Sequence, residues 1–206
     1  MKCEVLPVGA YEANCVVVWE DPALAWVFDP GADGGEIVGL LKKRGLSVGA
    51  VVLTHAHFDH ISALNEVLAA YPSAAVYLHG ADEAMAFSPM NRMPPYPGTA
   101  RPVALETGKA DGDVIACGGL SARVIHTPGH TPGSWCLYFE AAKLLVAGDT
   151  LFNGSIGRTD FPGGSMSAME RSLEILKGLP DETGVVCGHG PGSTIGAEKR
   201  GNPYLR

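Results

Sequence analysis

The sequence of 206 residues lacks the apolar segments that would place it in or across a membrane. No stretch reaches the roughly 18 uninterrupted apolar residues that indicate a membrane helix. Residues 1–7 carry no long apolar region of the kind found in a secretion signal. We therefore expect a cytoplasmic protein that does not act in a membrane.

Basic residues are scarce, and they do not cluster. The chain has 15 Lys and Arg against 22 Asp and Glu, which gives a net charge of −7. Residues 42–44 form the one compact basic run, and we interpret it as the exposed end of a helix. Because a phosphate backbone is bound by clustered Lys and Arg, nucleic acid is not an expected partner.

The cysteines show no pairing pattern. The chain has 5 of them, an odd number, and no two stand in a CxxC spacing. This pattern predicts neither a disulfide framework nor a zinc ribbon. We expect most of the thiols to be free and buried.

The composition is that of a folded protein. Apolar residues make up 46% of the chain, and charged residues, at 18%, stay below the usual quarter. Such a balance excludes a disordered chain. A chain of 206 residues can bury a sizeable core alone, so we expect one compact domain over residues 1–206.

Short apolar runs predict strands throughout the chain, and two stretches predict helices. Residues 34–44 form the first predicted helix. Residues 167–177 form the second, with Met169, Leu173 and Leu176 on one face. Strands interleaved with a few helices suggest two sheets face to face with helices outside. The predicted strands are residues 3–8, 15–19, 25–28, 50–53, 103–105, 120–126, 135–139, 143–147 and 184–187.

Residues 54–60 gather metal-ligand side chains into one short loop. The segment reads Thr-His-Ala-His-Phe-Asp-His, and it holds three of the 7 histidines in the chain. It follows the apolar run 50–53, so a strand end would hold these side chains in fixed directions. Neutral imidazoles and carboxylates are preferred ligands of zinc, iron and manganese, which favours a metal site over an exposed polar turn. The candidate ligands are His55, His57, Asp59 and His60.

Three further segments show an apolar run that is followed by Gly and then a ligand-type residue. The ligand-type residues are His130, Asp149 and His189. Gly before the ligand permits a tight turn and a close backbone approach. We therefore expect all three side chains to lie over the same edge of a sheet as the His-rich loop.

Seven candidate ligands are too many for one ion, because a catalytic zinc uses about three protein ligands and one water. Two divalent ions roughly 3.5–4 Å apart fit the count, with a hydroxide between them. Zinc is the first candidate, and iron and manganese are alternatives. The first set is His55, His57 and His130, the second is Asp59, His60 and His189, and Asp149 is the predicted bridge.

These motifs resemble those of the metallo-β-lactamase superfamily, in particular its small, single-domain type II glyoxalase-like hydrolases. The resemblance implies an α+β fold, an αββα sandwich of two mixed β-sheets flanked by helices, with one hydrolase domain over residues 1–206. It assigns the seven residues above as ligands. It also implies that Asp29 supports the His-rich loop from behind without touching metal. Besides the ligand loops, the shared segments are residues 14–15, 28–31, 127–133, 148–152, 157–164 and 188–191.

The resemblance implies hydrolysis of a small-molecule thioester, S-lactoylglutathione or a related hydroxyacylglutathione. A water shared by two dications loses much of its proton affinity, so a hydroxide nucleophile is present at neutral pH. We predict Asp149, as the bridge, and Asp59, which can orient the hydroxide, as the catalytic carboxylates. The sequence predicts no oligomeric state.

Arg158 is the predicted glutathione contact. Glutathione-thioester hydrolases of this family carry a basic residue shortly after the bridging Asp, and a guanidinium can clamp a carboxylate with two hydrogen bonds. An internal ion pair with Asp160 is the alternative. The chain departs from those enzymes because it does not include their separate C-terminal helical domain, and Gly190-Pro191 replaces an aromatic-containing segment.

Residues 87–98 are too rich in proline for a helix and too apolar for an idle linker. We interpret this segment as a loop over the site, with Met90, Arg92, Met93 and Tyr96 as substrate contacts. Packing onto the flank of the domain is the alternative.

Two histidines lie outside the ligand set. His126 precedes the predicted ligand His130 by four residues, and it is expected either to support a ligand or to pack in the core. We predict a structural role for His79.

Other functions of the same fold stay open. A sulfur dioxygenase acting on glutathione persulfide would use one iron, held here by His55, His130 and Asp149. A lactonase or β-lactamase is a further alternative, and a non-enzymatic metal-binding module is another. Removal of the metal separates the last from the enzymes, because a structural ion stabilises the fold itself.

Overall fold

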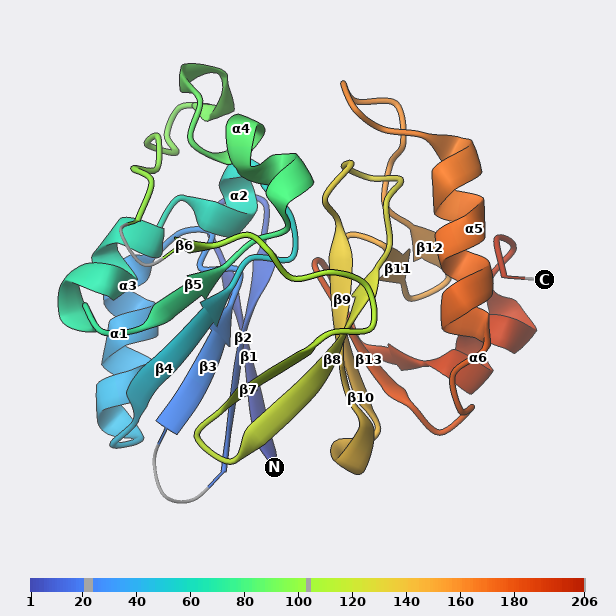
Figure 1. The fold of residues 1–206 in the computed structure, drawn as a ribbon, viewed down its shortest axis with the longest axis horizontal. Helices are drawn as coiled ribbons and strands as arrows, with labels where there is room; N and C mark the ends of the chain where they lie inside the picture. Colours follow the sequence, from blue (N-terminus) through green and yellow to red (C-terminus); the bar gives the residue numbers. More distant parts are fainter. Residues whose placement is uncertain (21–23, 103–104, 206) are drawn as a thin grey trace.

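The structure is a computed structural model that describes residues 1–20, 24–102 and 105–205. It contains two six-stranded sheets that pack face to face, and helices cover both outer faces (Figure 1). Both sheets mix parallel and antiparallel pairs. The predicted αββα sandwich of two mixed sheets is therefore confirmed.

The first sheet comes from the N-terminal half of the chain, and its strands follow one another in chain order. The first three strands pair antiparallel, and the later ones pair parallel. Helices α1 (Gly34–Lys43) and α3 (Leu64–Ala70) pack on its outer face. The strands are β1 (Lys2–Val8), β2 (Ala13–Glu20), β3 (Leu24–Phe28), β4 (Ser47–Val52), β5 (Ala75–Tyr77) and β6 (Leu105–Glu106).

The second sheet comes from the C-terminal half. Helices α5 (Met166–Lys177) and α6 (Ile195–Gly201) lie on its outer face, and the small hairpin β11 (Leu151–Phe152) and β12 (Ser155–Ile156) lies beside it (Figure 1). In sheet order, the strands are β14 (Ser193–Thr194), β13 (Gly184–Cys187), β10 (Leu144–Gly148), β9 (Trp135–Phe139), β8 (Leu120–His126) and β7 (Val114–Cys117).

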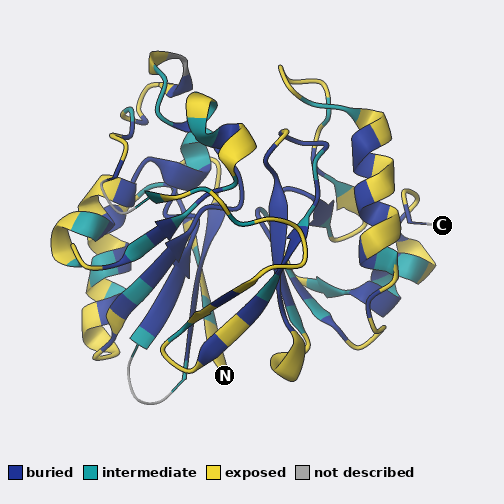
Figure 2. Cartoon of the chain, viewed as in Figure 1, coloured by how far each residue is buried: buried dark blue, intermediate teal, exposed yellow. Residues whose placement is uncertain are grey.

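The alternation of side chains along β2 explains its continuous apolar sequence. Val16 and Val18 point into the core between the two sheets, whereas Val17 and Trp19 point into the core beneath the helices. A strand buried on both faces needs apolar residues at every position. Figure 2 shows this pattern as buried strands in the middle of the sandwich and helices that expose only their outer faces.

Helix α5 follows its predicted amphipathic pattern. Met169, Leu173 and Leu176 are all buried in the core between the helix and the second sheet. The helix begins at Met166, because the Ser165 hydroxyl accepts a hydrogen bond from the Ala168 N–H at 3.3 Å and caps its first turn.

The connections that carry the predicted ligands gather at one edge of the sandwich, seen at the top of Figure 1 near α2 (Phe58–Ile61) and α4 (Glu83–Ala86). In the predicted loop 87–98, Pro89–Asn91 forms a 3-10 turn. Proline is tolerated in the first turn of a helix because the N–H at that position needs no helical partner. The other 3-10 turns are Gly80–Asp82 and Glu140–Ala142.

The sequence patterns missed several short elements, among them α3, α6, β5, β7 and β14. Strand β7 is an edge strand whose apolar run is only four residues long, and of these Val114 and Ala116 are exposed. In the predicted strand 103–105, residues 103 and 104 lie outside the described residues, and β6 begins at Leu105.

All five cysteines are free, as predicted. Cys15, Cys136 and Cys187 are buried, Cys117 is half-buried and Cys3 is exposed. None of the helices in the described ranges is long and apolar enough to cross a membrane.

Candidate metal centre

One buried carboxylate holds both ends of the His-rich loop. Asp29, at the end of β3, is 2% exposed. Its Oδ1 accepts the Thr54 N–H at 2.7 Å, and its Oδ2 accepts the Thr54 hydroxyl at 2.6 Å. Oδ2 also accepts Nδ1–H of His60 at 2.9 Å. The structure thus places Asp29 behind the loop, where it fixes the ring of His60 and leaves Nε2 free.

His57 and His130 face each other across the gap between the two sheets. Nδ1–H of His130 donates to the Arg158 carbonyl at 2.7 Å, so its Nε2 carries a free lone pair. This Nε2 lies 2.8 Å from Nδ1 of His57. Two nitrogens this close direct their lone pairs into one small volume, which is the arrangement that a shared cation needs.

His60 and His189 form a similar pair, with 3.2 Å between their Nε2 atoms. Nδ1–H of His189 donates to the Tyr11 carbonyl at 2.9 Å. The buried Asn14 amide donates to the carbonyls of Cys187 and Gly190, at 2.8 and 3.0 Å. Asn14, which belongs to the segment 14–15 noted in the sequence analysis, therefore holds the backbone on both sides of His189.

Asp149 lies between the two histidine pairs. Its Oδ2 is 3.5 Å from Nε2 of His130, and its Oδ1 is 3.5 Å from Nε2 of His60. Oδ1 of Asp149 and Nε2 of His55 are buried and have no hydrogen-bond partner in the described part of the chain. Because buried polar atoms nearly always have a partner, these two atoms fit metal ligands. Three groups of residues each bring their ligand atoms within 4.8 Å of one another. They are His55, His57 and His130; Asp59, His60 and His189; and Asp29, His55 and His60.

The electrostatics of the cluster suit a cation. Burial, with help from the neighbouring imidazoles, lowers the pKa of His57 to about 3 and that of His55 well below its usual value. Both rings are thus neutral and able to donate a lone pair to metal. Burial also disfavours the charged form of His60, but Asp149 and Asp29 outweigh it and raise the pKa of His60 to about 10. The carboxylates therefore favour positive charge at this place.

A cavity of about 570 Å³ opens directly over these donors. This volume lies in the range of small-molecule sites. Its walls mix ligand-type residues with large apolar side chains that come from both halves of the chain. They are Tyr11, His57, Phe58, Asp59, Met93, His130, Asp149, Phe152, Ser155, Ile156, Arg158, Phe161 and His189.

Arg158 lines this cavity and also makes the ion pair that was its alternative interpretation. Its Nε and Nη2 each donate to one carboxylate oxygen of Asp160 at 2.8 Å. The guanidinium lies over the Phe161 ring, 3.7 Å from the centroid. The ion pair with Asp160 is therefore present, and the glutathione contact of Arg158 stays a prediction.

Of the predicted substrate contacts in residues 87–98, the structure brings only Met93 to the cavity among those it describes. Arg92 is exposed and packs beside Gly98. Tyr96 is 6% exposed and lies behind Phe58, so it is not a wall of this cavity. The side chain of Met90 is outside the described residues.

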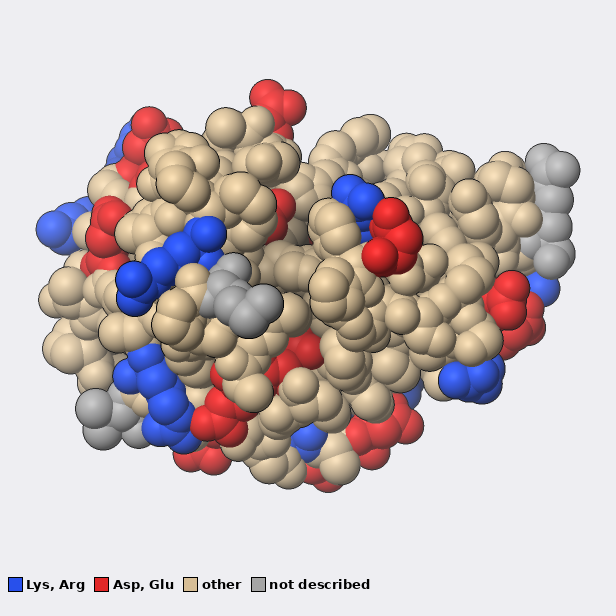
Figure 3. All heavy atoms as spheres, turned by 90° about the horizontal axis from the view of Figure 1, so that it is seen from above, with Lys and Arg blue, Asp and Glu red and all other residues tan. Residues whose placement is uncertain are grey.

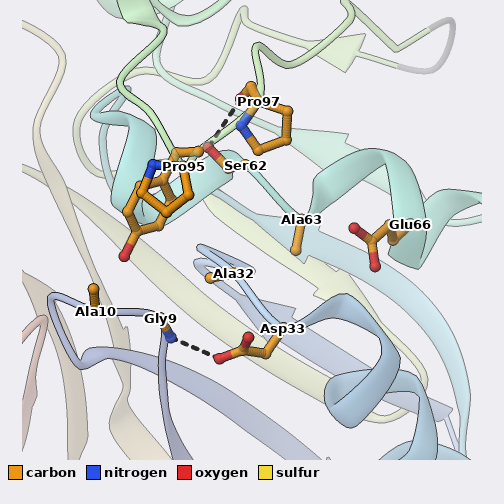
Figure 4. A pocket seen from close by; sticks show the side chains of 10 residues that line it. Gly9, Ala10, Ala32, Asp33, Ser62, Ala63, Glu66, Pro95 and Pro97 are labelled. Carbon is orange, nitrogen blue, oxygen red and sulfur yellow. Dashed lines mark hydrogen bonds between the residues drawn. The ribbon is translucent and has the colours of Figure 1, made fainter.

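Tyr96 instead lines a second cavity of about 400 Å³. In Figure 4, the carboxylates of Asp33 and Glu66 face this space, and the Gly9 N–H donates to Asp33. The hydroxyl of Ser62 is turned away from it, since it donates to the carbonyls of Phe58 and Pro97. None of the seven candidate ligands lines this second cavity.

His126 and His79 stack on each other, with ring centroids 4.1 Å apart. Nε2–H of His126 donates to the Pro132 carbonyl at 2.9 Å. His126 therefore contacts the backbone of the loop that carries His130 rather than a ligand imidazole, and it is only half-buried. Core packing is therefore not its role, and its support of the ligand His130 stays a prediction.

Sequence reasoning missed Asp82, a fully buried carboxylate between the two ligand loops. One of its oxygens accepts the Ala56 N–H at 3.0 Å and the Thr131 hydroxyl at 2.7 Å. The other accepts the Gly133 N–H at 2.7 Å. Asp82 thus ties the loop of His55 and His57 to that of His130. A single Asp after the apolar run 74–78 gives a weak signal, because most such residues lie in exposed turns.

A family model described as "Metallo-beta-lactamase superfamily" matches residues 8–189. The "Probable metallo-hydrolase YqgX" of Bacillus subtilis is 39% identical over 212 residues, which cover 100% of this chain and 98% of that protein. The "Hydroxyacylglutathione hydrolase GloC" of Haemophilus influenzae is 32% identical over 215 residues, with 100% and 98% covered.

Solved structures agree with the fold. The chain is similar to the BLEG-1 B3 metallo-beta-lactamase, with a TM-score of 0.90, 37% identity and 99% of each chain covered. It is also similar to TTHA1623 in a di-iron-bound form, with a TM-score of 0.80 and 34% identity over 98% of this chain and 100% of that one.

Proposed function

Because the chain belongs to the metallo-beta-lactamase superfamily, we propose that it is a binuclear metallohydrolase that cleaves S-lactoylglutathione or a related hydroxyacylglutathione thioester. The observation that carries this proposal is the convergence of two donor sets on Asp149 beneath one open cavity. The similarity to a hydroxyacylglutathione hydrolase supports the substrate. We assign the activity to one hydrolase domain over residues 1–206.

In this proposal the chain holds two divalent ions, with zinc as the first candidate and iron or manganese as alternatives. When bound, such ions supply an activated water at neutral pH and polarise the thioester carbonyl. His55, His57 and His130 would hold the first ion, while Asp59, His60 and His189 would hold the second. Asp149 would be shared between them, since its Oδ1 lies near His60 and its Oδ2 lies near both His130 and His189.

The residues behind the ligands keep the site in its working geometry. Asp29 and the carbonyls of Arg158 and Tyr11 each accept one imidazole N–H. These hydrogen bonds select the tautomer of His60, His130 and His189, so that the other ring nitrogen carries the lone pair. The donors are therefore oriented before any ion or substrate enters.

The chain needs no strong proton donor for the leaving group. A thiol has a pKa of roughly 8.5, so a thiolate leaves without prior protonation. We assign Arg158 to the thiol part of the substrate, because it is the cationic side chain at the cavity and a guanidinium binds carboxylates. Asp160 already pairs with it, so a substrate carboxylate has to share or displace that partner.

The first test is the metal content of protein purified without added metal, measured by elemental mass spectrometry together with hydrolysis of lactoylglutathione. We expect about two ions per chain and thioester turnover. Asp149→Asn should lose most of the activity and at least one ion, whereas Asp113→Asn, at an exposed Asp that does not line the cavity, should keep both. Full activity with two ions in Asp149→Asn would contradict the bridging role.

A mononuclear-iron dioxygenase acting on glutathione persulfide is the second candidate, in which His55, His130 and Asp149 would hold one iron. The same sample distinguishes it: one iron, no hydrolysis and oxygen uptake with glutathione persulfide would replace the hydrolase assignment. Turnover of a lactone or a β-lactam in place of the thioester would support the lactonase or β-lactamase alternative, to which the similarity with the BLEG-1 enzyme points.

A further inference from the structure

We propose that the acyl group of the substrate is uncharged, apolar and longer than lactoyl, and that it lies against an apolar wall formed by Tyr11, Phe58 and Met93. This inference rests on the proposed thioester hydrolysis and adds the chemistry of the acyl group. It comes from the shape, exposure and charge of the cavity over the metal centre.

The apolar wall is built before a ligand arrives. The rings of Tyr11 and Phe58 meet edge to face, with centroids 5.5 Å apart. The buried Tyr96 ring packs behind both, 5.7 Å from Tyr11 and 5.0 Å from Phe58, and its hydroxyl accepts the Tyr11 N–H at 3.3 Å. The backbone of Met93 is tied to this unit, because the Tyr96 N–H donates to its carbonyl at 2.6 Å. Because these side chains are already held in place, binding of an apolar group costs little of their conformational entropy.

The wall exposes large apolar side chains that a folded chain would normally cover. Tyr11 is 52% exposed and Met93 is 46% exposed, and both line the same cavity. They reach it from two segments that are far apart in the sequence. Adjacent exposed apolar side chains at a cavity, rather than scattered ones, mark a ligand-binding surface.

The described side chains of this wall offer no cationic partner to an anionic acyl group. Among the described lining residues, Arg158 is the only Lys or Arg, and it comes from the other half of the chain and pairs with Asp160. Figure 3, seen from the edge that carries the ligand loops, shows mostly uncharged surface around the central hollow and no gathering of basic side chains. A carboxylate at the wall would lose its water and find no partner there. Because Arg158 is assigned to the thiol part of the substrate, we assign the acyl part to the apolar wall.

The test is a series of glutathione thioesters with acetyl, lactoyl, butyryl and hexanoyl groups, assayed with the metal-loaded full chain. We expect kcat/KM to rise from acetyl to hexanoyl, by about four-fold for each methylene that the wall buries. A flat series with clear turnover would overturn this inference and leave the proposed function intact. Absence of turnover with every thioester would overturn both.

Variants of the wall residues test whether the dependence of kcat/KM on acyl chain length comes from this wall. Tyr11→Ser and Met93→Ser should each flatten the chain-length series, since each removes apolar surface from the wall. Tyr204→Ser is the matched control, because Tyr204 is 48% exposed but does not line the cavity. A series that stays steep in both wall variants would show that the acyl group lies elsewhere. Met93 lies on an exposed loop, so its variant remains informative if Tyr11→Ser fails to fold.

Discussion

Asp82 illustrates how much of the metal centre depends on residues that touch no ion. It accepts hydrogen bonds from the backbone on either side of the cluster, at Ala56 and Gly133, and from the Thr131 side chain. A carboxylate accepts all of these with its two oxygens, whereas an amide presents one oxygen and one NH₂ group. The relative position of His57 and His130 is therefore sensitive to this one side chain.

Asp82→Asn should weaken metal binding and destabilise the fold by about 1–3 kcal/mol, because at least one buried donor loses its acceptor. Competition with a chelator measures the first effect, and denaturant unfolding measures the second. Asp113→Asn is the control, since Asp113 is exposed and its side chain accepts a single described hydrogen bond, from Ala110 N–H. Unchanged metal affinity in Asp82→Asn would rule out the positioning role.

Gly188 is a second residue on which the geometry of the metal centre depends, because a larger side chain does not fit there. A Cβ at this position would lie 1.9 Å from Oδ1 of Asp149 and 3.0 Å from Cε1 of His60. We expect Gly188→Ala to displace Asp149 and to remove at least one ion per chain, measured by elemental mass spectrometry. Gly35→Ala is the control, because its Cβ would meet nothing within 4 Å on helix α1, and it should keep the ions. Two ions in Gly188→Ala would show that Asp149 does not depend on this close approach.

The residues that converge at the metal centre could be selected from sequence because their pattern is local. His55, His57, Asp59 and His60 stand together, and the other three each follow a Gly at a strand end. Asp82 and Tyr96 could not be assigned in this way, since their roles depend on which distant segments pack against them. Tyr96 was predicted to touch the substrate, yet it is buried behind the residues that line the cavity.

At the level of elements, a continuous apolar run made several strands that are buried on both faces predictable. Strands β2, β3 and β10 carry continuous apolar runs because one face meets the other sheet and the other face meets helices. The edge strands β7 and β14 were missed, because β7 is an apolar run of only four residues and β14 consists of Ser193 and Thr194, so that backbone pairing rather than a sequence pattern defines them.

Variants of helix α5 measure how much its buried face contributes to the free energy of unfolding. Leu173→Ala should lower the free energy of unfolding by about 2–5 kcal/mol, because it leaves a cavity beneath the second sheet. Ile175→Ala, on the exposed face of the same helix, should change it by about 0.5 kcal/mol or less. Guanidinium unfolding with an unchanged m value tests both. Equal losses in the two variants would contradict the assignment of the buried face.

Across the whole molecule, three apolar cores lie in the layers of the sandwich, and none of them contains a predicted ligand. Metal removal by EDTA should therefore abolish activity but leave the secondary structure intact, as followed by circular dichroism. Zinc added afterwards should restore turnover. Loss of the circular dichroism signal on chelation would favour a structural ion over a catalytic pair.

The two donor sets are also divided between the two halves of the chain. His55 and His57 come from the first half and meet His130 from the second, while Asp59 and His60 meet His189 in the same way. Neither half carries a complete donor set, so in the proposed centre an ion would meet all of its ligands only after both sheets have docked in register. We therefore expect a chain with misdocked halves to lose metal binding and activity together.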